Sequence, residues 1–458
     1  MIRKDNHKGR KMDTPIYQFV EQWNQKHYTR FHMPGHKGNR EVYNNSISAV
    51  FPYDITEIEG ADVLFASDGI IRKSERRAAE LFGSKDTVYS AGGSTLCIQT
   101  MVGLAAKRGK KIIAGRNAHM AFIHACILFQ MDPIWILPQT VDAYGVCGLI
   151  TSEQVENTLR EHSDSCAVYL TSPDYLGNTI DLKRISEICK AYGVPLFCDN
   201  AHGAYLKFTG EGSHPLDQGV DICCDSAHKT LPVLTGGAYL HWSKSFEISV
   251  EEVKKMMSLF GSSSPSYLIL QSLDLCNRYL SESAFMDYQI LKRRICQIKE
   301  QLSQQKIGFL KNQVDFAKLT IDANSIGYTG EELKEQLHQA GIEAEYYNQQ
   351  YVVYLLSPMN CKEDDDIFCK ALQTLSIRPQ KNFYVDHYQL PPKDRLPFEA
   401  YWQDAKVIPI EQAEKRIAAE TVASCPPGVP LIVPGEIITE QIKKICKNSR
   451  NLFIKVVK

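Results

Sequence analysis

The chain has 458 residues, of which 44% are hydrophobic and 23% charged, and its formal net charge at pH 7 is -1. These values are typical of a globular protein with about two or three domains, and the balanced charge gives no reason to expect nucleic acid or an anionic membrane as a partner. No run of about 18 apolar residues predicts a transmembrane helix, and no apolar segment follows the charged N-terminus as in a signal peptide.

The first 304 residues predict an N-terminal arm followed by a large α/β domain. Residues 1–45 form the arm, with one helix expected at 17–24. From 46 to 304, short apolar strands alternate with helices, which is typical of a mostly parallel sheet covered on both faces. Strands are expected at 87–90, 111–114, 133–137, 167–170, 195–198, 222–225 and 237–241. Helices are expected at 74–82, 95–107, 119–129, 152–162 and 183–192, and within 250–304.

The rest of the chain predicts smaller α+β domains. Residues 305–380 form one of them, with strands expected at 316–321, 344–347 and 351–356 and helices at 330–340 and 363–375. A stretch rich in proline and polar residues then leads into a C-terminal domain over 381–458. That domain is expected to contain a helix at 411–422 and a strand at 431–433.

An open parallel sheet binds ligands at the carboxyl ends of its strands, so the residues that follow the strands are the candidates for a site. After the strand at 87–90, the segment 91–95 combines glycines with Ser94 and Thr95 at a helix start, which favours an anion. A plain helix cap by Ser94 explains the same residues. After the next strand, His119 could stack on an aromatic cofactor, or it could simply lie at the start of a helix.

The apolar strand at 195–198 leads directly into Asp199. A carboxylate buried at a strand end needs a partner, and a protonated pyridine nitrogen is a suitable one. Ala201 is small enough to lie beneath a flat ring. The alternative, a helix cap by Asp199, explains neither Ala201 nor His202.

The strand at 222–225 is followed by Lys229, an unusual place for a charge. An amine in a partly dry site has a lowered pKa and becomes a nucleophile toward carbonyl groups. Ser226 and His228 are close enough in sequence to bind a phosphate beside it. The alternative is a lysine that faces solvent on the following loop.

Two further features carry less information. A serine-rich turn that includes Ser263 and Ser264 could bind phosphate, although such turns are usually plain loops. The fourteen cysteines mostly stand singly in apolar runs, as buried thiols do in the reducing cytoplasm. No CxxC pair predicts a zinc site, and no metal is expected.

The order of these residues (phosphate turn, histidine, aspartate, lysine) resembles that of fold-type-I pyridoxal-phosphate (PLP) enzymes. More closely, the chain resembles the Orn/Lys/Arg decarboxylase family, in a short form without an N-terminal response-regulator-like domain. The strings that carry the resemblance are HMPGHKG at 32–38, RNAH at 116–119, DNAHGA at 199–204, SAHKTLP at 226–232, SPSY at 264–267, PPGVP at 426–430 and PGE at 434–436.

The resemblance implies a large domain like that of aspartate aminotransferase and a role for each matching residue. Lys229 would hold the cofactor as a Schiff base, Asp199 would pair with the pyridine nitrogen, and His119 would stack on the ring. The remaining cofactor-binding residues would be Ser94, Thr95, Ala201, His202, Ser226, His228, Ser263 and Ser264, the last two reaching the partner's phosphate in a homodimer or larger homo-oligomer with its active site at the interface.

The implied reaction is PLP-dependent decarboxylation of a basic amino acid in polyamine metabolism, with L-arginine or L-lysine favoured and L-ornithine a third candidate. His228 or Lys229 would return the proton, and Asp62 or Glu436 would bind the distal cation of the substrate. Two positions depart from the family pattern: Phe65 replaces an expected histidine, and Cys425 an expected aromatic residue. An aminotransferase or lyase on the same fold and a catalytically silent PLP-binding relative therefore stay open as alternatives.

Overall fold

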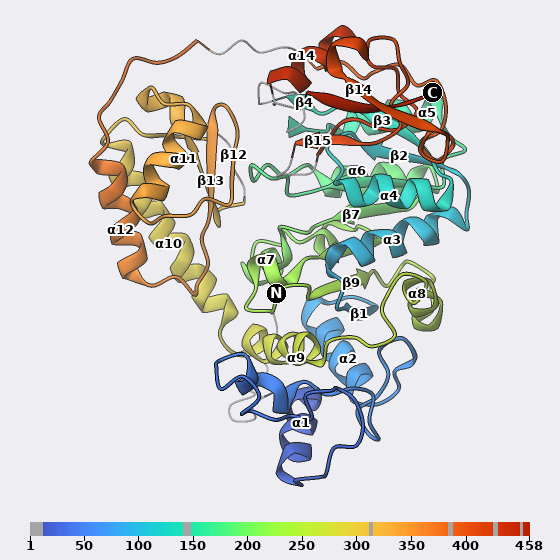
Figure 1. Ribbon diagram of the computed structural model, residues 1–458, viewed down its shortest axis with the longest axis vertical. Coiled ribbons are helices and arrows are strands. Elements are labelled where there is room, and N and C mark those ends of the chain that lie inside the picture. Colours follow the sequence, from blue (N-terminus) through green and yellow to red (C-terminus); the bar gives the residue numbers. More distant parts are fainter. Residues whose placement is uncertain (1–11, 141–147, 311–314, 383–387, 425–428, 449–451) are drawn as a thin grey trace.

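A seven-stranded sheet forms the centre of the computed structural model, which describes residues 12–140, 148–310, 315–382, 388–424, 429–448 and 452–458 (Figure 1). The strands lie in the order β1-β9-β8-β7-β6-β2-β3, and β9 runs antiparallel to both of its neighbours while the other pairs are parallel. The strands are β1 (Asp86–Ser90), β2 (Lys111–Gly115), β3 (Asp132–Ile136), β6 (Ala167–Thr171), β7 (Leu196–Asp199), β8 (Ile222–Asp225) and β9 (Ala238–Trp242).

Helices cover both faces of this sheet. Helices α3 (Gly93–Ala106), α4 (Met120–Phe129) and α8 (Val250–Met257) share one apolar cluster with the strands. Helices α5 (Ser152–Glu161) and α6 (Leu182–Ala191) share another. Because both faces are buried, the parallel strands are almost continuous apolar runs, and this is why they could be recognised in the sequence.

The N-terminal helix α1 (Pro15–Gln25) packs against α2 (Ile70–Phe82) and α9 (Tyr267–Glu282). The first turn of α1 is fixed by a residue far away in the sequence. The carboxylate of Asp274, in α9, accepts hydrogen bonds from the backbone N–H groups of Ile16 and Tyr17 at 2.9 and 3.0 Å. Short elements complete this large domain: η1 (Ser48–Tyr53), η2 (Leu64–Ala66), β4 (Gln139–Thr140), β5 (Gly148–Leu149), η3 (Ala204–Phe208), η4 (Pro215–Gln218) and α7 (Ala227–Thr230).

The long helix α10 (Ala284–Ser303) leads into a small domain built on a four-stranded antiparallel sheet (Figure 1). Its elements are β10 (Gly308–Phe309), β11 (Lys318–Asp322), η5 (Ala323–Ile326), α11 (Gly330–Gln339), β12 (Tyr346–Tyr347), β13 (Tyr351–Leu355) and α12 (Lys362–Gln373).

The last part of the chain, drawn in red in Figure 1, has its own apolar cluster. Its elements are α13 (Pro397–Tyr401), β14 (Ala405–Pro409), η6 (Ile410–Gln412), β15 (Val422–Ser424), β16 (Val429–Ile432), α14 (Glu440–Asn448) and β17 (Phe453–Val457). The helix predicted at 411–422 is wrong. Although its Ala, Glu, Lys and Arg residues favour an α-helix, the segment starts in the short η6 and continues irregularly, and bridges from Ile417 to Ile437 and from Ala418 to Val456 pair its middle with distant parts of the chain. Tertiary pairing here overrides local propensity.

The expected α/β class, with a mostly parallel sheet and smaller α+β parts, is confirmed. Among the described residues, no helix is both long enough and apolar enough to cross a membrane.

Candidate active site

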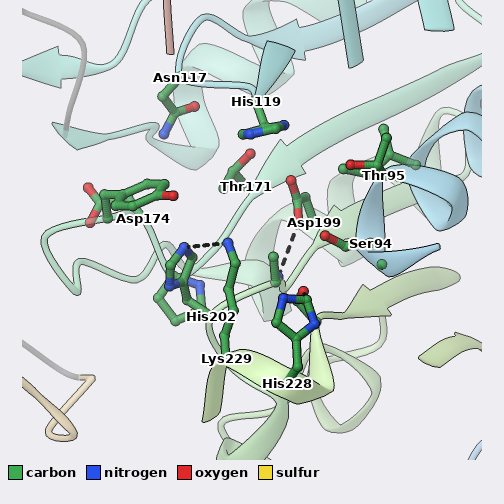
Figure 2. Close-up of a pocket in the computed structure, with 16 residues that line it drawn as sticks. Ser94, Thr95, Asn117, His119, Thr171, Asp174, Asp199, His202, His228 and Lys229 are labelled. Carbon is green, nitrogen blue, oxygen red and sulfur yellow. Dashed lines mark hydrogen bonds between the residues drawn. The ribbon is translucent and has the colours of Figure 1, made fainter. Parts of the chain in front are cut away.

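A cavity of about 180 Å³ lies at the carboxyl ends of β6, β7 and β8 (Figure 2). The starts of α3 and α4 close it from the other side. The predicted residues that line it are Ser94, Thr95, His119, Asp199, Ala201, His202, Ser226, His228 and Lys229. Residues separated by more than 100 positions therefore meet in one place, as the strand-end rule requires.

Asp199, the last residue of β7, is buried against hydrogen-bond donors. Its Oδ2 accepts the Tyr169 hydroxyl at 3.2 Å and its Oδ1 accepts the N–H of Ala201 at 3.1 Å. These neutral donors stabilise the carboxylate without cancelling its charge. A cationic ring nitrogen at this wall would be matched electrostatically, and the small side chain of Ala201 leaves room beside it.

Lys229 lies in the short helix α7 and points into the cavity. Its Nζ is 3.0 Å from Nε2 of His202, and Figure 2 shows this contact at the lower side of the cavity. Burial, followed by the charges of Lys318 and Lys229, keeps the pKa of His202 well below its usual value. The neutral imidazole can therefore accept a hydrogen bond from the lysine.

In the cofactor-free protein, Lys229 is expected to react with an amine-selective reagent at a lower pH than an ordinary lysine. Burial lowers its pKa, and the charge of Lys318 acts in the same direction, while Asp199 and Glu345 oppose the shift. A lowered pKa leaves more neutral, nucleophilic amine at any given pH. Labelling followed by peptide mass spectrometry should give a midpoint below that of exposed lysines in the same digest. An equal or higher midpoint would contradict the prediction.

His119 lies at the start of a helix and also lines the cavity. Its Nδ1 accepts the N–H of Ala121 at 3.1 Å and so caps α4. The same ring lines the cavity, and Figure 2 places it on the side opposite Lys229 and His228. Burial lowers its pKa. A neutral ring on this wall suits stacking on an aromatic ligand.

The turn before α3 and the loop after β8 face each other across the same end of the cavity. Gly93 has a φ of 68°, and its N–H donates to the carbonyl of Gly236 at 2.7 Å. This left-handed conformation, which favours glycine, brings Ser94 and Thr95 to the cavity. On the facing loop, Nδ1 of His228 is 3.1 Å from the carbonyl of Gly237 and 3.4 Å from Oγ of Ser226. Hydroxyl groups and a helix start therefore converge where an anion would bind.

Asn117, Thr171 and Tyr175 line the cavity but were not among the predicted site residues, whereas His202 was. Buried side-chain atoms of Asn117, Thr171 and His202 have no hydrogen-bond partner among the described residues. Because unpaired buried polar atoms are costly, they indicate a site built for a polar ligand. The Tyr175 ring lies edge-on to His202 at 4.5 Å and 5.5 Å from Nζ of Lys229. Thr171 is the last residue of β6 and Tyr175 follows it four residues later, so the strand-end rule applied to that strand would have found them.

Four predicted residues do not line this cavity. Ser263 is exposed, and Ser264 borders a neighbouring cavity of about 260 Å³ that shares Thr95 with the first. The carboxylate of Asp62 accepts N–H groups at the start of α2, including that of Ile71 at 2.9 Å. Glu436 is buried in a pair with Arg116. The expectation that Asp62 or Glu436 binds substrate is therefore not supported by this structure, because each carboxylate is used within the chain.

Of the two departures from the family pattern, only Phe65 lies among the described residues. Phe65 borders the second cavity and lies against Gly261, where an added Cβ would meet the Phe65 ring at 2.2 Å. Cys425 and the quoted residues 426–428 lie outside the described residues. The substitution at position 65 therefore affects the second cavity, while the cavity that contains Lys229 keeps its predicted residues.

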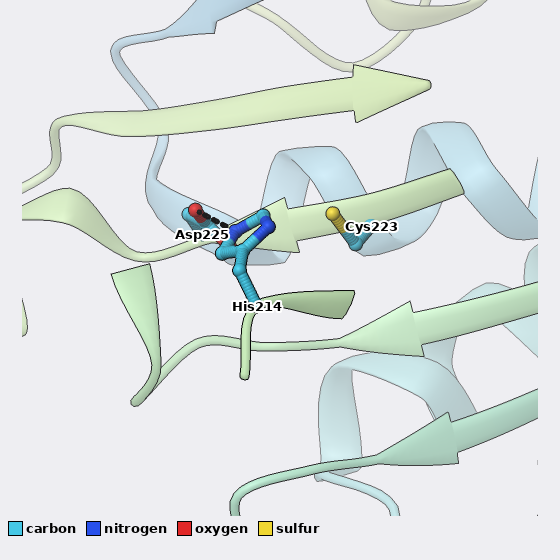
Figure 3. A group of neighbouring side chains, drawn as sticks. All are labelled: His214, Cys223 and Asp225. Carbon is cyan, nitrogen blue, oxygen red and sulfur yellow. Dashed lines mark hydrogen bonds and ion pairs between the residues drawn. The ribbon is translucent and has the colours of Figure 1, made fainter. Parts of the chain in front are cut away.

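Beneath the site, His214, Cys223 and Asp225 lie together in the core (Figure 3). Their atom types could bind a metal ion, but the histidine already contacts the carboxylate, with Nε2 of His214 3.0 Å from Oδ2 of Asp225. The other carboxylate oxygen accepts Nδ2 of Asn200 at 2.7 Å. Although burial acts to raise it, the pKa of Asp225 is well below its usual value because of His214 and His241. This ionised group ties the loop that carries Asn200 to the loop that carries Lys229.

Comparison with known proteins identifies the family of the chain. A family model described as the Orn/Lys/Arg decarboxylase major domain matches residues 14–313, and one described as the C-terminal domain of the same family matches 387–451. An arginine decarboxylase of Bacillus subtilis (strain 168) is 30% identical over 460 residues, which cover 95% of this chain and 94% of the relative. An arginine decarboxylase of Halalkalibacterium halodurans is 29% identical over 471 residues, covering 96% of this chain and 94% of the relative.

The fold is also that of a solved structure. The crystal structure of a lysine decarboxylase from Francisella novicida matches with a TM-score of 0.81 and 16% identity, covering 97% of this chain and 81% of that chain. The family model spans most of the sequence, and the residues around the cavity fit PLP, the cofactor that the family implies. The chain therefore belongs to the Orn/Lys/Arg decarboxylase family and is a PLP-dependent amino-acid decarboxylase.

Proposed function

We propose that this protein converts a basic amino acid to the corresponding amine and CO2, with L-arginine the favoured substrate, L-lysine the second and L-ornithine the third. The observation that carries the proposal is the convergence of Asp199, Lys229 and His119 on one cavity in a chain of this family. The preference for arginine is supported by relatives named arginine decarboxylases that align with nearly the whole chain.

The cavity residues fit PLP by their chemistry. Ser94, Thr95, Ser226 and His228 would hold its phosphate, Asp199 its ring nitrogen, and Ala201 and His119 its two faces. Lys229 would form the covalent bond. When bound, the cofactor supplies a cationic ring that accepts the electrons of the bond to the departing carboxylate.

The chain's own residues orient the substrate and manage protons. The Asp199 carboxylate, held by Tyr169 and the N–H of Ala201, would face the ring nitrogen. His202 accepts a hydrogen bond from Lys229 and so directs the amine into the cavity. Burial lowers the pKa of both Lys229 and His228, and both line the cavity, so either would be placed to exchange a proton with the substrate α-carbon. Tyr175 helps to exclude water, which favours loss of CO2.

The distal cation of the substrate needs an acidic partner, and Glu345 is the best candidate. Asp174 lines the cavity, but its carboxylate is already used by the N–H groups of Leu176 and Asn178 at 2.9 Å each. Glu345 is exposed and yet close enough for its charge to raise the pKa of Lys229, against the larger effect of burial. The next residue, Tyr346, contacts Tyr175 with ring centres 5.8 Å apart. Glu345 is therefore near Lys229 without lining the cavity, and we propose that it meets the distal end of a long substrate.

Replacing Glu345 with glutamine is expected to raise KM for arginine while kcat changes little. A hydrogen bond to a charged group contributes about 1.5–3 kcal/mol, which corresponds to roughly a 10- to 100-fold increase in KM. The matched control is Glu343→Gln, an exposed carboxylate two residues earlier that pairs with His338. If both variants keep the wild-type KM, another group binds the distal cation.

The decisive experiment for the function is to incubate the purified protein with PLP and each of arginine, lysine and ornithine, and to measure CO2 and amine. Equal amounts of CO2 and agmatine from arginine are expected to exceed the products from the other two substrates. A keto acid without CO2 would identify an aminotransferase. A Lys229-dependent absorbance band without any product would identify a silent PLP-binding relative.

We also propose that the chain forms a homodimer or a larger homo-oligomer with the active site at its interface. Large apolar side chains of the N-terminal region are strongly exposed in the single chain, among them Phe31, Tyr43 and Ile47. Exposed apolar side chains of this kind mark association surfaces. Light scattering should give at least twice the chain mass, and a monomer with full activity would contradict the proposal.

A further inference from the structure

A fully buried ion pair joins the C-terminal domain to the segment that precedes His119. Arg116 directly follows β2, and its guanidinium binds Glu436 through two parallel contacts, Nη1 to Oε1 and Nη2 to Oε2, both at 2.8 Å. Arg116 has no exposed surface, and Glu436 is 3% exposed. Nη2 also donates to the Tyr388 hydroxyl at 3.1 Å and to the carbonyl of Leu431 at 3.3 Å. A bidentate pair of this kind fixes direction as well as distance.

Each partner is held firmly on its own side. The N–H of Arg116 donates to the carbonyl of Ile136 at 2.9 Å, and the guanidinium lies 4.9 Å from the centre of the Trp135 ring. Oε2 of Glu436 accepts the N–H of Val433 at 2.9 Å. The preceding Gly435 has a φ of 90°, and an added Cβ there would lie 2.3 Å from the carbonyl oxygen of Arg395. The pair therefore joins two rigid backbone segments.

The segment that this pair holds carries two side chains into the active-site cavity. Asn117, the next residue, lines the cavity with a buried amide oxygen that has no partner among the described residues. His119 lines the same cavity two residues later. A buried ion pair contributes little net stability, because removing both charges from water costs about as much as their attraction returns. Its value lies instead in geometry.

We propose that Glu436 and Arg116 are positioning residues, through which the C-terminal domain fixes the segment that places Asn117 and His119 against the bound cofactor. The inference rests on the proposed cofactor site. It gives the C-terminal domain a role in catalysis without contact with the substrate. It also replaces the substrate-binding role expected for Glu436 from the sequence.

The test compares full-length variants by visible circular dichroism of bound PLP, by kcat and KM, and by thermal midpoint. Glu436→Gln leaves Arg116 buried without its anion, and the dichroic band and kcat are expected to fall, kcat by roughly tenfold or more, because a small displacement of a positioned group costs rate. KM should change little. In the double variant Arg116→Met with Glu436→Leu, both charges are removed, so the thermal midpoint should recover while the dichroic band and kcat stay low.

The matched control is Lys393→Met. Lys393 binds Asp132 at 2.6 Å and joins the C-terminal part of the chain to the start of β3, but at the surface. An exposed pair of this kind contributes little, so wild-type dichroism and kcat are expected. Wild-type dichroism and kcat in the double variant would overturn the proposal and leave the pair a purely structural contact.

A further variant and the choice of readout keep the test decisive. Tyr388→Phe removes one contact to the guanidinium while keeping the ion pair, and a smaller loss of dichroism in the same direction is expected. This variant decides the question if neither Glu436 variant folds, and unchanged dichroism would then overturn the proposal. Because dichroism reports cofactor geometry without turnover, it separates failure of this inference from failure of the proposed reaction.

Discussion

Replacing Lys229 with alanine is expected to reduce amine and CO2 release by at least about a thousandfold, because the residue that binds the cofactor covalently and exchanges protons is lost. The absorbance band of the protein-bound Schiff base should disappear at the same time. Activity and absorbance are both measured after the variant is incubated with PLP. The amine of Lys229 is the one that the structure places in the cavity, in contact with His202.

Two controls make the Lys229 result specific. Lys207→Ala removes a lysine that pairs with Asp217 outside the cavity, and it should keep both the band and the activity. Lys318 is a buried lysine whose charge acts on Lys229, and it pairs with Asp315 at 3.2 Å. A residual band in Lys229→Ala that disappears on further replacement of Lys318 would mean that the covalent role is assigned to the wrong residue.

Replacing Asp199 with asparagine is expected to lower kcat by about 10²- to 10³-fold while PLP still binds to Lys229, because one preorganised electrostatic contact is lost from a buried site. Asparagine keeps the shape of the side chain but lacks the charge that would hold the ring nitrogen protonated. Steady-state kinetics on the preferred substrate measures the loss, and the absorbance band confirms that the cofactor is bound.

The matched control is Asp221→Asn. Asp221 is also a buried carboxylate, and it accepts the N–H of Leu196 at 2.9 Å at the opposite end of the same strands. This change should affect stability and leave kcat within about a few-fold of wild type, as for residues that do not touch the reacting groups. If both variants lose kcat equally, the effect of Asp199→Asn reflects general damage to the sheet.

The central sheet and most cavity residues could be predicted from the sequence because their signals are local. Strands buried on both faces must be apolar along their length, so their ends are visible in the sequence. In a parallel sheet those ends meet at one edge, and Asp199 and Lys229 follow two adjacent strands. That these two residues lie close together could therefore be predicted from the sheet topology alone, without knowledge of any side-chain contact.

The partners of individual carboxylates could not be predicted in this way. Asp62 accepts backbone N–H groups at the start of α2, and Glu436 pairs with an arginine 320 positions away. Which cation or donor an acid meets depends on the packing of distant segments. From the sequence these carboxylates were candidates for substrate binding, whereas in the structure each one accepts hydrogen bonds from groups of the chain itself.

The sequence by itself predicted the α/β class from apolar periodicity, indicated the family through its motifs, and placed Lys229 and Asp199 at the ends of neighbouring strands, because all of these signals are properties of short segments. Only the tertiary structure decided that the segment 411–422 forms no α-helix, since its bridges to Ile437 and Val456 outweigh its helix propensity. The tertiary structure also revealed the contact between the C-terminal domain and Arg116. Contacts between segments far apart in the chain form only when the whole chain packs, and no local pattern encodes them.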